Sequence, residues 1–381
     1  MDRTVLVLGG GVGGIVAATR LRRLLPRGHR VILIDREPQH LFQPSLLWLA
    51  VGRRQPEQIQ RPLARLQRKG IEVLTGEIAG LAPEVKRVRV NDTELTGDAL
   101  IVSLGADLAS DAVPGLANAG HNLYTLTGAL GIRSALEHFS GGRVVVLTAT
   151  AAYKCPAAPY EAAMLFHDYL ERRSRGHATV EIFAAESGPM GTAGPDVSAA
   201  VRGMVEARGI AYHPDHQLES VDPAARRLHF RGGASTDYDL LVYVPPHRAP
   251  AVVQQAGLLG ASGWIPVDAH SLQTQVPGIF AIGDVTGIPI PSGKALPKAG
   301  VFAHREAEVV AENLASEWLG RVPQRAFDGV GACFIEAGSG RAGYGSGNFY
   351  AAPAPTMRLH APSRYWHFGE VLFEKRWLWG W

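Results

Sequence analysis

The two cysteines of the chain, Cys155 and Cys333, are the side chains whose possible chemistry is most specific. Stable disulfides are uncommon in the cytoplasm, and cysteine pairs found there tend to be catalytic or redox-sensing. Cys155 opens the block Cys-Pro-Ala-Ala-Pro-Tyr-Glu-Ala-Ala, and Cys333 precedes Phe-Ile-Glu in a glycine-rich context. Because the two lie far apart in the sequence, spacing leaves two interpretations open: a redox pair, or two unrelated buried thiols.

An acid follows each cysteine at short range. Glu161 stands at the start of an expected helix, a few residues after Cys155. It is either a proton carrier for thiol chemistry or an acid favourably placed near a helix N-terminus. Glu336 lies close after Cys333, and we interpret it as a solvated loop acid.

Two lysines, Lys294 and Lys298, precede a helix that we expect to begin around Ala299. A helix N-terminus carries partial positive charge and stabilises an anion bound at that end. The lysines either add to this effect and polarise an oxygen of an electron acceptor, or are ordinary surface lysines. We assign Lys298 to catalysis and to cofactor binding.

A dinucleotide fingerprint at the start of the chain indicates what must position these groups. The apolar run 4–8 leads into Gly9-Gly-Gly11-Val-Gly-Gly14, and a helix is expected over 13–25. In the G-x-G-x-x-G turn the glycines allow a tight bend and a close approach of the backbone to a pyrophosphate. A second strand ends at Asp35, where a carboxylate would bind the adenosine ribose.

A second strand of this kind, 143–148, lacks the glycines that should follow it. The turn over 149–160 contains Cys155, alanines and prolines instead. A nicotinamide-binding turn needs glycines at this place. The sequence therefore predicts a flavoprotein whose electron donor is not NAD(P)H.

The remaining pattern predicts an α/β fold with two Rossmann-like dinucleotide-binding domains, the second inserted in the first, plus a C-terminal membrane or interface segment. We expect an FAD-binding domain over 1–108 and 266–320, a second domain over 109–265 and a C-terminal redox-cysteine and membrane-attachment region over 321–381. Further strands are expected at 31–34, 99–106, 180–183 and 240–244, a meander from 73–76 through 88–90, and helices at 123–139, 161–172 and 197–208.

Several stretches resemble known flavoproteins. Gly278-Ile-Phe-Ala-Ile-Gly283-Asp284 resembles the second flavin fingerprint of the two-dinucleotide-domain flavoproteins, in which the aspartate contacts the ribityl chain of FAD. Gly105, at the end of a buried strand, joins Gly283 and Asp284 in our predicted cofactor site. The blocks 155–163, 293–303 and 333–336 together resemble the sulfide:quinone oxidoreductases and the flavoprotein subunit of flavocytochrome c sulfide dehydrogenase.

The resemblance implies an enzyme that oxidises sulfide to sulfur or polysulfide. A Cys155–Cys333 disulfide would be attacked by hydrosulfide, leaving a persulfide on one cysteine and a thiolate on the other. The resemblance places Cys333 beside the flavin, which would pass the electrons to a membrane quinone. Many relatives carry a third cysteine, but the region 105–121 has none, and His121 is its only candidate. We therefore expect FAD to be non-covalent.

Other functions stay open at this point. A type-II NADH:quinone dehydrogenase shares the architecture but needs the missing glycine motif. A sulfide dehydrogenase flavoprotein subunit would donate electrons to a cytochrome instead of a quinone. A non-enzymatic flavin and thiol redox sensor would react with sulfide once, without catalytic turnover.

Composition restricts partners and location. A net charge of +3 gives no reason to expect nucleic acid. No run approaches the about 18 apolar residues of a membrane-spanning helix. The first expected strand begins at residue 4, which leaves no room for a signal peptide, so we expect a cytoplasmic location. We expect no metal, and a homo-oligomer stays open.

The tail, 365–381, is rich in tryptophan and basic residues. Trp366, Phe373, Trp377 and Trp381 have helix-compatible spacing, which suits a membrane interface. The alternative is a terminal element packed on the core or at a dimer interface. We expect peripheral attachment to the inner face of the cell membrane, where the enzyme could take quinone from the bilayer.

Overall fold

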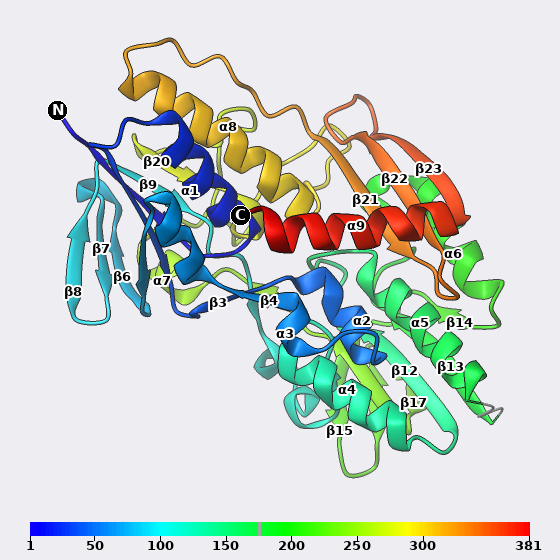
Figure 1. The fold of residues 1–381 in the computed structure, drawn as a ribbon. Helices are drawn as coiled ribbons and strands as arrows, with labels where there is room; N and C mark the ends of the chain where they lie inside the picture. Colours follow the sequence, from blue (N-terminus) through cyan, green and yellow to red (C-terminus); the bar gives the residue numbers. More distant parts are fainter. Residues whose placement is uncertain (174–176) are drawn as a thin grey trace.

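A five-stranded parallel sheet holds the N-terminal fingerprint. The computed structural model describes residues 1–173 and 177–381, and Figure 1 shows its ribbon. The strand order is β20-β9-β1-β2-β5, so a strand from late in the chain completes a sheet begun at the N-terminus. The strands are β1 (Thr4–Leu8), β2 (Arg30–Asp35), β5 (Glu72–Thr75), β9 (Ala99–Val102) and β20 (Ile279–Ala281).

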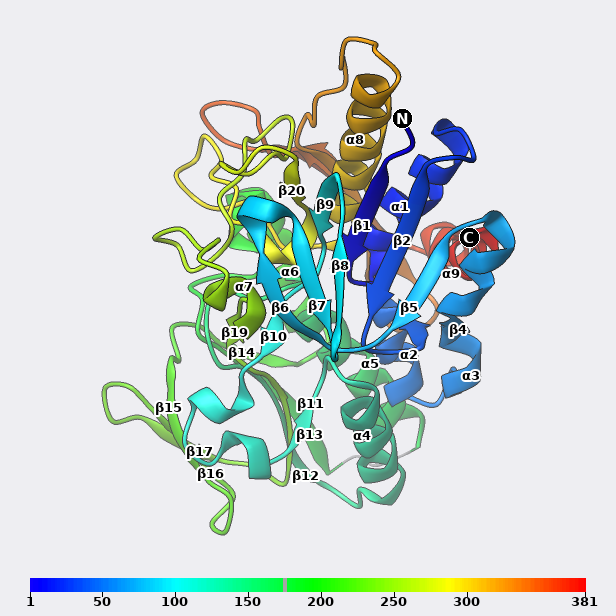
Figure 2. The ribbon, with the colours of Figure 1, turned by 90° about the vertical axis from the view of Figure 1, so that its left-hand side faces the viewer.

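The side chains of β1 point alternately to the two faces of this sheet, and both faces are covered. Val5 and Val7 join one core cluster with helices α1 (Val12–Leu24) and α8 (Gly300–Trp318), which lie side by side (Figure 1). Leu6 and Leu8 join another cluster on the opposite face. That face is covered by helix α7 (Ala251–Gln255) and by the meander β6 (Ile78–Ala82), β7 (Arg87–Val90) and β8 (Thr93–Thr96), which Figure 2 shows nearest the viewer.

The expected meander from residue 73 is wrong in its first part. Strand β5 pairs in parallel with β2 at the edge of the sheet, and the antiparallel meander begins only at β6. The backbone N–H of Gly76 donates to the carbonyl of Asp35, which extends the pairing with β2 to the end of β5. Alternation in a short apolar run does not distinguish a parallel edge strand from the first strand of a meander.

A second five-stranded parallel sheet forms between β9 and β20 in the sequence, in the order β11-β18-β12-β13-β14. Its strands are β11 (His121–Asn122), β12 (Gly142–Thr148), β13 (Ala178–Ala184), β14 (Ala211–His213) and β18 (Leu240–Val244). Its helices are α4 (Leu126–His138), α5 (Ala158–Arg172) and α6 (Pro195–Glu206), and a meander of β15 (Leu218–Asp222), β16 (Arg227–Phe230) and β17 (Ser235–Asp237) accompanies it. The predicted α/β class with two Rossmann-like sheets is confirmed.

The C-terminal region adds an antiparallel sheet and a long helix. The sheet contains β21 (Val330–Glu336), β22 (Ala342–Asn348) and β23 (Thr356–Ser363). Helix α9 (Arg364–Gly380) packs on this sheet and contacts the segment around α2 (Leu46–Ala50), so it crosses the middle of the molecule (Figure 1). Among the described residues, no helix has both the length and the apolar character needed to cross a bilayer. The remaining short elements are β3 (Gln39–Leu41), β4 (Gln60–Pro62), α3 (Pro56–Ile59), β10 (Asp107–Leu108) and β19 (His247–Arg248).

Candidate active site

The fingerprint glycines have three different local requirements. Gly9 has a φ of +103°, which only glycine adopts readily. A Cβ on Gly14 would overlap the carbonyl oxygen of Gly9, so this glycine is needed for close packing of helix on strand. A Cβ on Gly11 would meet no atom within 4 Å. The backbone at Gly11, at the start of α1, is therefore open to the close approach that a pyrophosphate needs.

Asp35 stands at the end of β2, facing the same loop. One carboxylate oxygen accepts a hydrogen bond of 2.5 Å from the N–H of Gly10, and the other accepts one of 2.7 Å from the N–H of Glu37. Asp35 therefore holds the loop from the side where the predicted ribose would bind. Gly105, with a φ of +69°, lies just beyond β9, and a Cβ there would also meet open space.

The second flavin motif and the lysine block meet at one place. Gly283 and Asp284 form a tight turn after β20, and Lys298 donates from Nζ to the carbonyls of Asp284 (2.6 Å) and Thr286 (2.8 Å). The ammonium group also lies 3.4 Å from the ring centre of Trp264. Burial lowers the pKa of Lys298 to about 8, although Asp284 opposes this effect. Lys298 is thus no ordinary surface lysine, whereas Lys294 is exposed and donates to the carbonyl of Gly191.

Glu306, a buried acid on α8 beside this turn, is a residue that sequence reasoning missed. Its carboxylate accepts a 2.6 Å hydrogen bond from the N–H of Gly283, and burial raises its pKa to about 7. Glu306, Gly283, Lys298 and Ala299 line a hollow at the N-terminus of α8, whose empty volume is about 200 Å³ with the open side included. In the sequence, Glu306 looks like any glutamate on the surface of a helix. Only the packing of α8 shows that its side chain is buried beside Gly283.

Both cysteines line a single larger cavity. Cys155, Cys333, Pro297 and Phe302 are among its walls, and its empty volume is about 710 Å³ with the open mouth included. Its lining is apolar apart from the two thiols, Thr192 and Arg358. Both cysteines are free thiols in this structure. The fold therefore brings together two side chains that the sequence places far apart.

Cys155 is held in an unusual backbone conformation. Its φ of +48° lies in the left-handed region, which costs a non-glycine residue energy. Its N–H donates a 2.7 Å hydrogen bond to the carbonyl of Lys298, and its own carbonyl accepts from Ala158 at the start of α5. The cysteine turn is therefore fastened directly to the lysine block.

The surroundings of the cavity raise the pKa of both thiols. Burial, reinforced by the charge of Glu161, raises the pKa of Cys155 to about 12. Cys333 is solvent-exposed, and its pKa is raised by the cavity wall and by the charges of Cys155, Glu161 and Glu370. A protonated thiol is a poor nucleophile. The pair is better suited to be attacked as a disulfide than to attack as free thiols.

Glu161 is buried in the first turn of α5, with 5% of its surface exposed. One carboxylate oxygen accepts a 2.7 Å hydrogen bond from the backbone N–H of Glu336. Burial raises the pKa of Glu161 to about 8, and the charge of Glu336 adds to the increase. A carboxyl group that titrates near neutral pH and influences both thiols is suited to carry protons.

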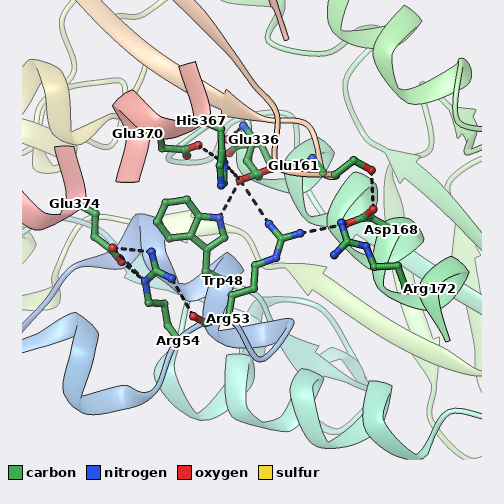
Figure 3. A network of polar contacts seen from close by, with 12 residues as sticks. Trp48, Arg53, Arg54, Glu161, Asp168, Arg172, Glu336, His367, Glu370 and Glu374 are labelled. Carbon is green, nitrogen blue, oxygen red and sulfur yellow. Dashed lines mark hydrogen bonds and ion pairs between the residues drawn. The ribbon is translucent and has the colours of Figure 1, made fainter. Parts of the chain in front are cut away.

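Glu336 is not the solvated loop acid that we expected. It ends strand β21, is 1% exposed and lies at the centre of the network in Figure 3. Its carboxylate accepts hydrogen bonds from Trp48 Nε1 (2.9 Å) and from the N–H of Gly338 (2.9 Å), and it lies 3.0 Å from His367 Nδ1. Burial alone would raise its pKa, but the nearby His367 and the N–H of Trp48 outweigh that effect and lower it.

Helix α9 closes this network from the other side. Glu374 pairs with Arg54 at 2.8 Å (Figure 3). It also accepts a 2.6 Å hydrogen bond from Ser45. The possible ligand atoms of Glu336, His367 and Glu370 lie within 4.8 Å of one another, which is compatible with a metal ion. Hydrogen bonds already occupy the carboxylate of Glu336.

The glycine-poor turn after β12 has filled the second nucleotide site with its own side chains. Glu186 follows β13, where a dinucleotide fold places the acid that binds a ribose. Here its carboxylate accepts hydrogen bonds from Thr148 (2.7 Å), from Tyr160 (2.5 Å) and from Tyr153. These three hydroxyl groups of the protein compete with the hydroxyl groups of a ribose for this carboxylate.

The tail is helical, but its exposed side differs from our expectation. Trp377 donates to His40, Trp381 is buried and Trp366 stacks on Tyr344 with ring centres 4.5 Å apart. These three tryptophans pack on the protein because their side of α9 faces the core. The exposed apolar side chains of α9 are Tyr365, Phe368, Leu372, Phe373 and Trp379, which we call the α9 face.

Comparison with known proteins agrees with this architecture. The family model of the pyridine nucleotide-disulphide oxidoreductases matches residues 3–307. The mitochondrial sulfide:quinone oxidoreductase of Mus musculus is 24% identical over 93% of this chain and 80% of its own length. The sulfide-quinone reductase of Aquifex aeolicus is 26% identical over 100% of this chain and 91% of its own length. An X-ray structure of the sulfide:quinone oxidoreductase from Aquifex aeolicus superposes with a TM-score of 0.90 at 25% identity, covering 99% of this chain and 91% of that one. The chain therefore belongs to the pyridine nucleotide-disulphide oxidoreductase family.

Proposed function

We propose that this protein is an FAD-dependent sulfide:quinone oxidoreductase. The observation that carries the proposal is the meeting of Cys155 and Cys333 in one apolar cavity, next to the Lys298 block. The similarity to sulfide:quinone oxidoreductases of Aquifex aeolicus and Mus musculus supports it.

FAD would supply a two-electron acceptor that links the thiols to the quinone. Gly9, Gly11 and Gly14 would hold its pyrophosphate, and Asp35 its ribose. Gly105, Gly283, Asp284 and Lys298 would contact the rest of the cofactor. The binding would be non-covalent, because the region 105–121, where many relatives carry a third cysteine, has none. In this proposal residues 1–108 and 266–320 form the FAD domain, 109–265 the second domain and 321–381 the C-terminal region.

The cysteine pair would act in its disulfide form. Hydrosulfide attacks one sulfur, the S–S bond breaks, and a persulfide and a thiolate result. The persulfide would then lose its outer sulfur and its proton, the Cys155–Cys333 bond would form again, and FAD would supply the acceptor for the two electrons on their way to the quinone. Glu161 would exchange protons with the sulfur groups. Sulfide is thereby oxidised to the level of elemental sulfur while the quinone is reduced to a quinol. Lys298 would stabilise negative charge at the cofactor.

The occupied second site argues against the nearest alternative, a type-II NADH:quinone dehydrogenase. Tyr153, Tyr160 and Thr148 already bind Glu186, the acid that a nicotinamide nucleotide would need. This favours an electron donor that reacts through the cysteine cavity.

The α9 face would attach the enzyme to a membrane. Tyr365, Phe368, Leu372 and Trp379 are between 56% and 73% exposed. Lys375 and Arg376, both exposed, lie on the same helix and suit anionic headgroups. This arrangement would place the enzyme on the inner face of the cell membrane, within reach of quinone.

An anaerobic titration tests the proposal. The purified yellow protein is mixed with sulfide and, separately, with NADH, while flavin absorbance is recorded. We expect bleaching by sulfide alone, reversal by a soluble quinone, and loss of the sulfide reaction in Cys155→Ser and in Cys333→Ser. Dithionite should still bleach both variants, which controls for bound flavin. Bleaching by NADH but not by sulfide would refute the proposal.

A further inference from the structure

The backbone of the turn that carries Cys155 needs support from its surroundings. The φ of +48° at Cys155 lies in the left-handed region, where a side chain crowds the backbone. Without support, this residue would relax to a right-handed or extended conformation, and its side chain would then point in another direction. Two backbone hydrogen bonds, with Lys298 and Ala158, hold the turn from outside and from within.

The hydroxyl group of Tyr124 adds a third point of support. It donates a 2.7 Å hydrogen bond to the carbonyl of Lys154 and lies 3.2 Å from the carbonyl of Cys155, so that its single hydrogen is shared between them. Among residues 1–173 and 177–381, no other side chain bonds to the backbone of these two residues. The two carbonyls belong to the planar peptide groups on either side of the Cys155 Cα. A bond to both therefore restricts φ and ψ of Cys155.

Tyr124 is itself held firmly. It is 8% exposed and lies between β11 and α4, where its N–H donates a 2.9 Å hydrogen bond to Oδ1 of Asn122. Its ring meets that of His247 edge-on, with ring centres 5.8 Å apart, and the ammonium group of Lys154 lies 5.7 Å from its ring centre. Burial raises the pKa of Tyr124 well above its usual value, so the hydroxyl keeps the hydrogen that it donates.

We propose that Tyr124 is a positioning residue that holds the sulfur of Cys155 where it can pair with Cys333. This inference rests on the proposed function, because the proposed cycle forms the disulfide again in each turnover. Cys333 lies inside β21, which is paired with β22 along its whole length, so it does not follow Cys155 if the turn moves. Tyr124 acts on the backbone of the turn and takes no part in the bond-making step.

Preorganisation is the physical basis of the expected effect. Two thiols held in the geometry of a disulfide form it with little further loss of freedom, whereas a mobile turn must first be ordered. Loss of the Tyr124 hydroxyl should therefore shift the equilibrium with an external dithiol toward the two free thiols. In that exchange the cysteine pair gains two electrons and two protons from the external dithiol, which closes to a cyclic disulfide.

The test compares Tyr124→Phe with Tyr153→Phe in the full-length, FAD-loaded enzyme. Tyr153 is the matched control, because it is also 8% exposed and lies two residues before Cys155, but its hydroxyl donates to the side chain of Glu186. Each protein is incubated without oxygen in mixtures of reduced and oxidised dithiothreitol, and free thiols are trapped with a maleimide. Because the chain has only two cysteines, the mass of the product reports the state of the pair.

We expect the ratio of reduced to oxidised dithiothreitol that opens half of the disulfide to fall about 5-fold or more in Tyr124→Phe, which is the effect of losing one ordinary hydrogen bond. In Tyr153→Phe the ratio should stay within about 2-fold of the wild type. All samples are kept well below the unfolding temperature measured for each variant, so lower stability does not imitate the shift.

The outcomes separate this inference from the proposed function. An unchanged ratio in Tyr124→Phe would overturn the role of Tyr124, and so would an equal shift in Tyr153→Phe, because it would indicate a general cost of losing a buried hydroxyl. If the ratio shifts as expected but sulfide does not bleach the wild-type flavin, Tyr124 still positions the pair and only the proposed function fails. A wild-type enzyme that forms no Cys155–Cys333 disulfide would overturn both.

Discussion

Replacing Glu161 by glutamine should make the protein more stable at alkaline pH and less active. The side chain is 5% exposed, and burial raises its pKa from 4.5 to about 8. The folded protein therefore holds a proton between these pH values that the unfolded chain releases. Stability should fall as pH rises across this interval, by about 1.4 kcal/mol per pH unit.

The size of the pKa shift of Glu161 limits how much the free energy of unfolding can change with pH. A shift from 4.5 to about 8 corresponds to an upper bound of about 5 kcal/mol. Glutamine cannot ionise and still accepts the hydrogen bond from the N–H of Glu336. Glu161→Gln should therefore lack this pH dependence and unfold at higher urea concentration than the wild type above pH 8. Activity should fall by roughly 100-fold or more if Glu161 carries protons.

Urea unfolding between pH 4.5 and 9 measures directly how steeply the free energy of unfolding changes with pH. Glu171→Gln, at an exposed position on the same helix, is the matched control and should keep the slope of the wild type. Equal slopes in Glu161→Gln and in the wild type would refute the reasoning, because they would show that Glu161 is ionised in the folded protein at neutral pH.

Three further predictions concern the cofactor and the membrane. Gly14→Ala should abolish FAD binding, measured by flavin absorbance after purification, because its Cβ would overlap the carbonyl of Gly9; a yellow variant would contradict the assignment. Lys298→Met should lower the flavin midpoint potential by about 30 mV for each 1.4 kcal/mol of lost charge stabilisation, and an unchanged potential in a redox titration would remove Lys298 from the cofactor site. Phe368→Glu should abolish co-sedimentation with anionic vesicles, whereas Val322→Glu, at another exposed apolar position, should not; equal effects would argue against the α9 face.

Local patterns in the sequence were sufficient for the fold class and for the backbone geometry of the N-terminal glycine turn. The positions of Gly9 and Gly14 depend on a bend and on a close contact within one strand-turn-helix unit, so neighbouring residues specify them. The missing glycines after residue 148 likewise predicted a second sheet without a nucleotide site. The structure adds that the hydroxyl groups of Tyr153 and Tyr160 donate hydrogen bonds to Glu186, the acid that such a site would use.

Burial of polar groups, in contrast, depends on contacts between distant segments. Glu336 has the sequence context of a loop acid, but α2, α5 and α9 enclose it. The tryptophans of the tail have a membrane-like spacing, yet Trp381 lies against the core, because the contacts of α9 decide which of its sides is exposed. The sequence determined by itself that the chain has a flavin-type fingerprint and two cysteines. Only the tertiary structure placed Cys155 and Cys333 in one cavity and joined that cavity to buried acids, because these contacts connect residues that no local pattern relates.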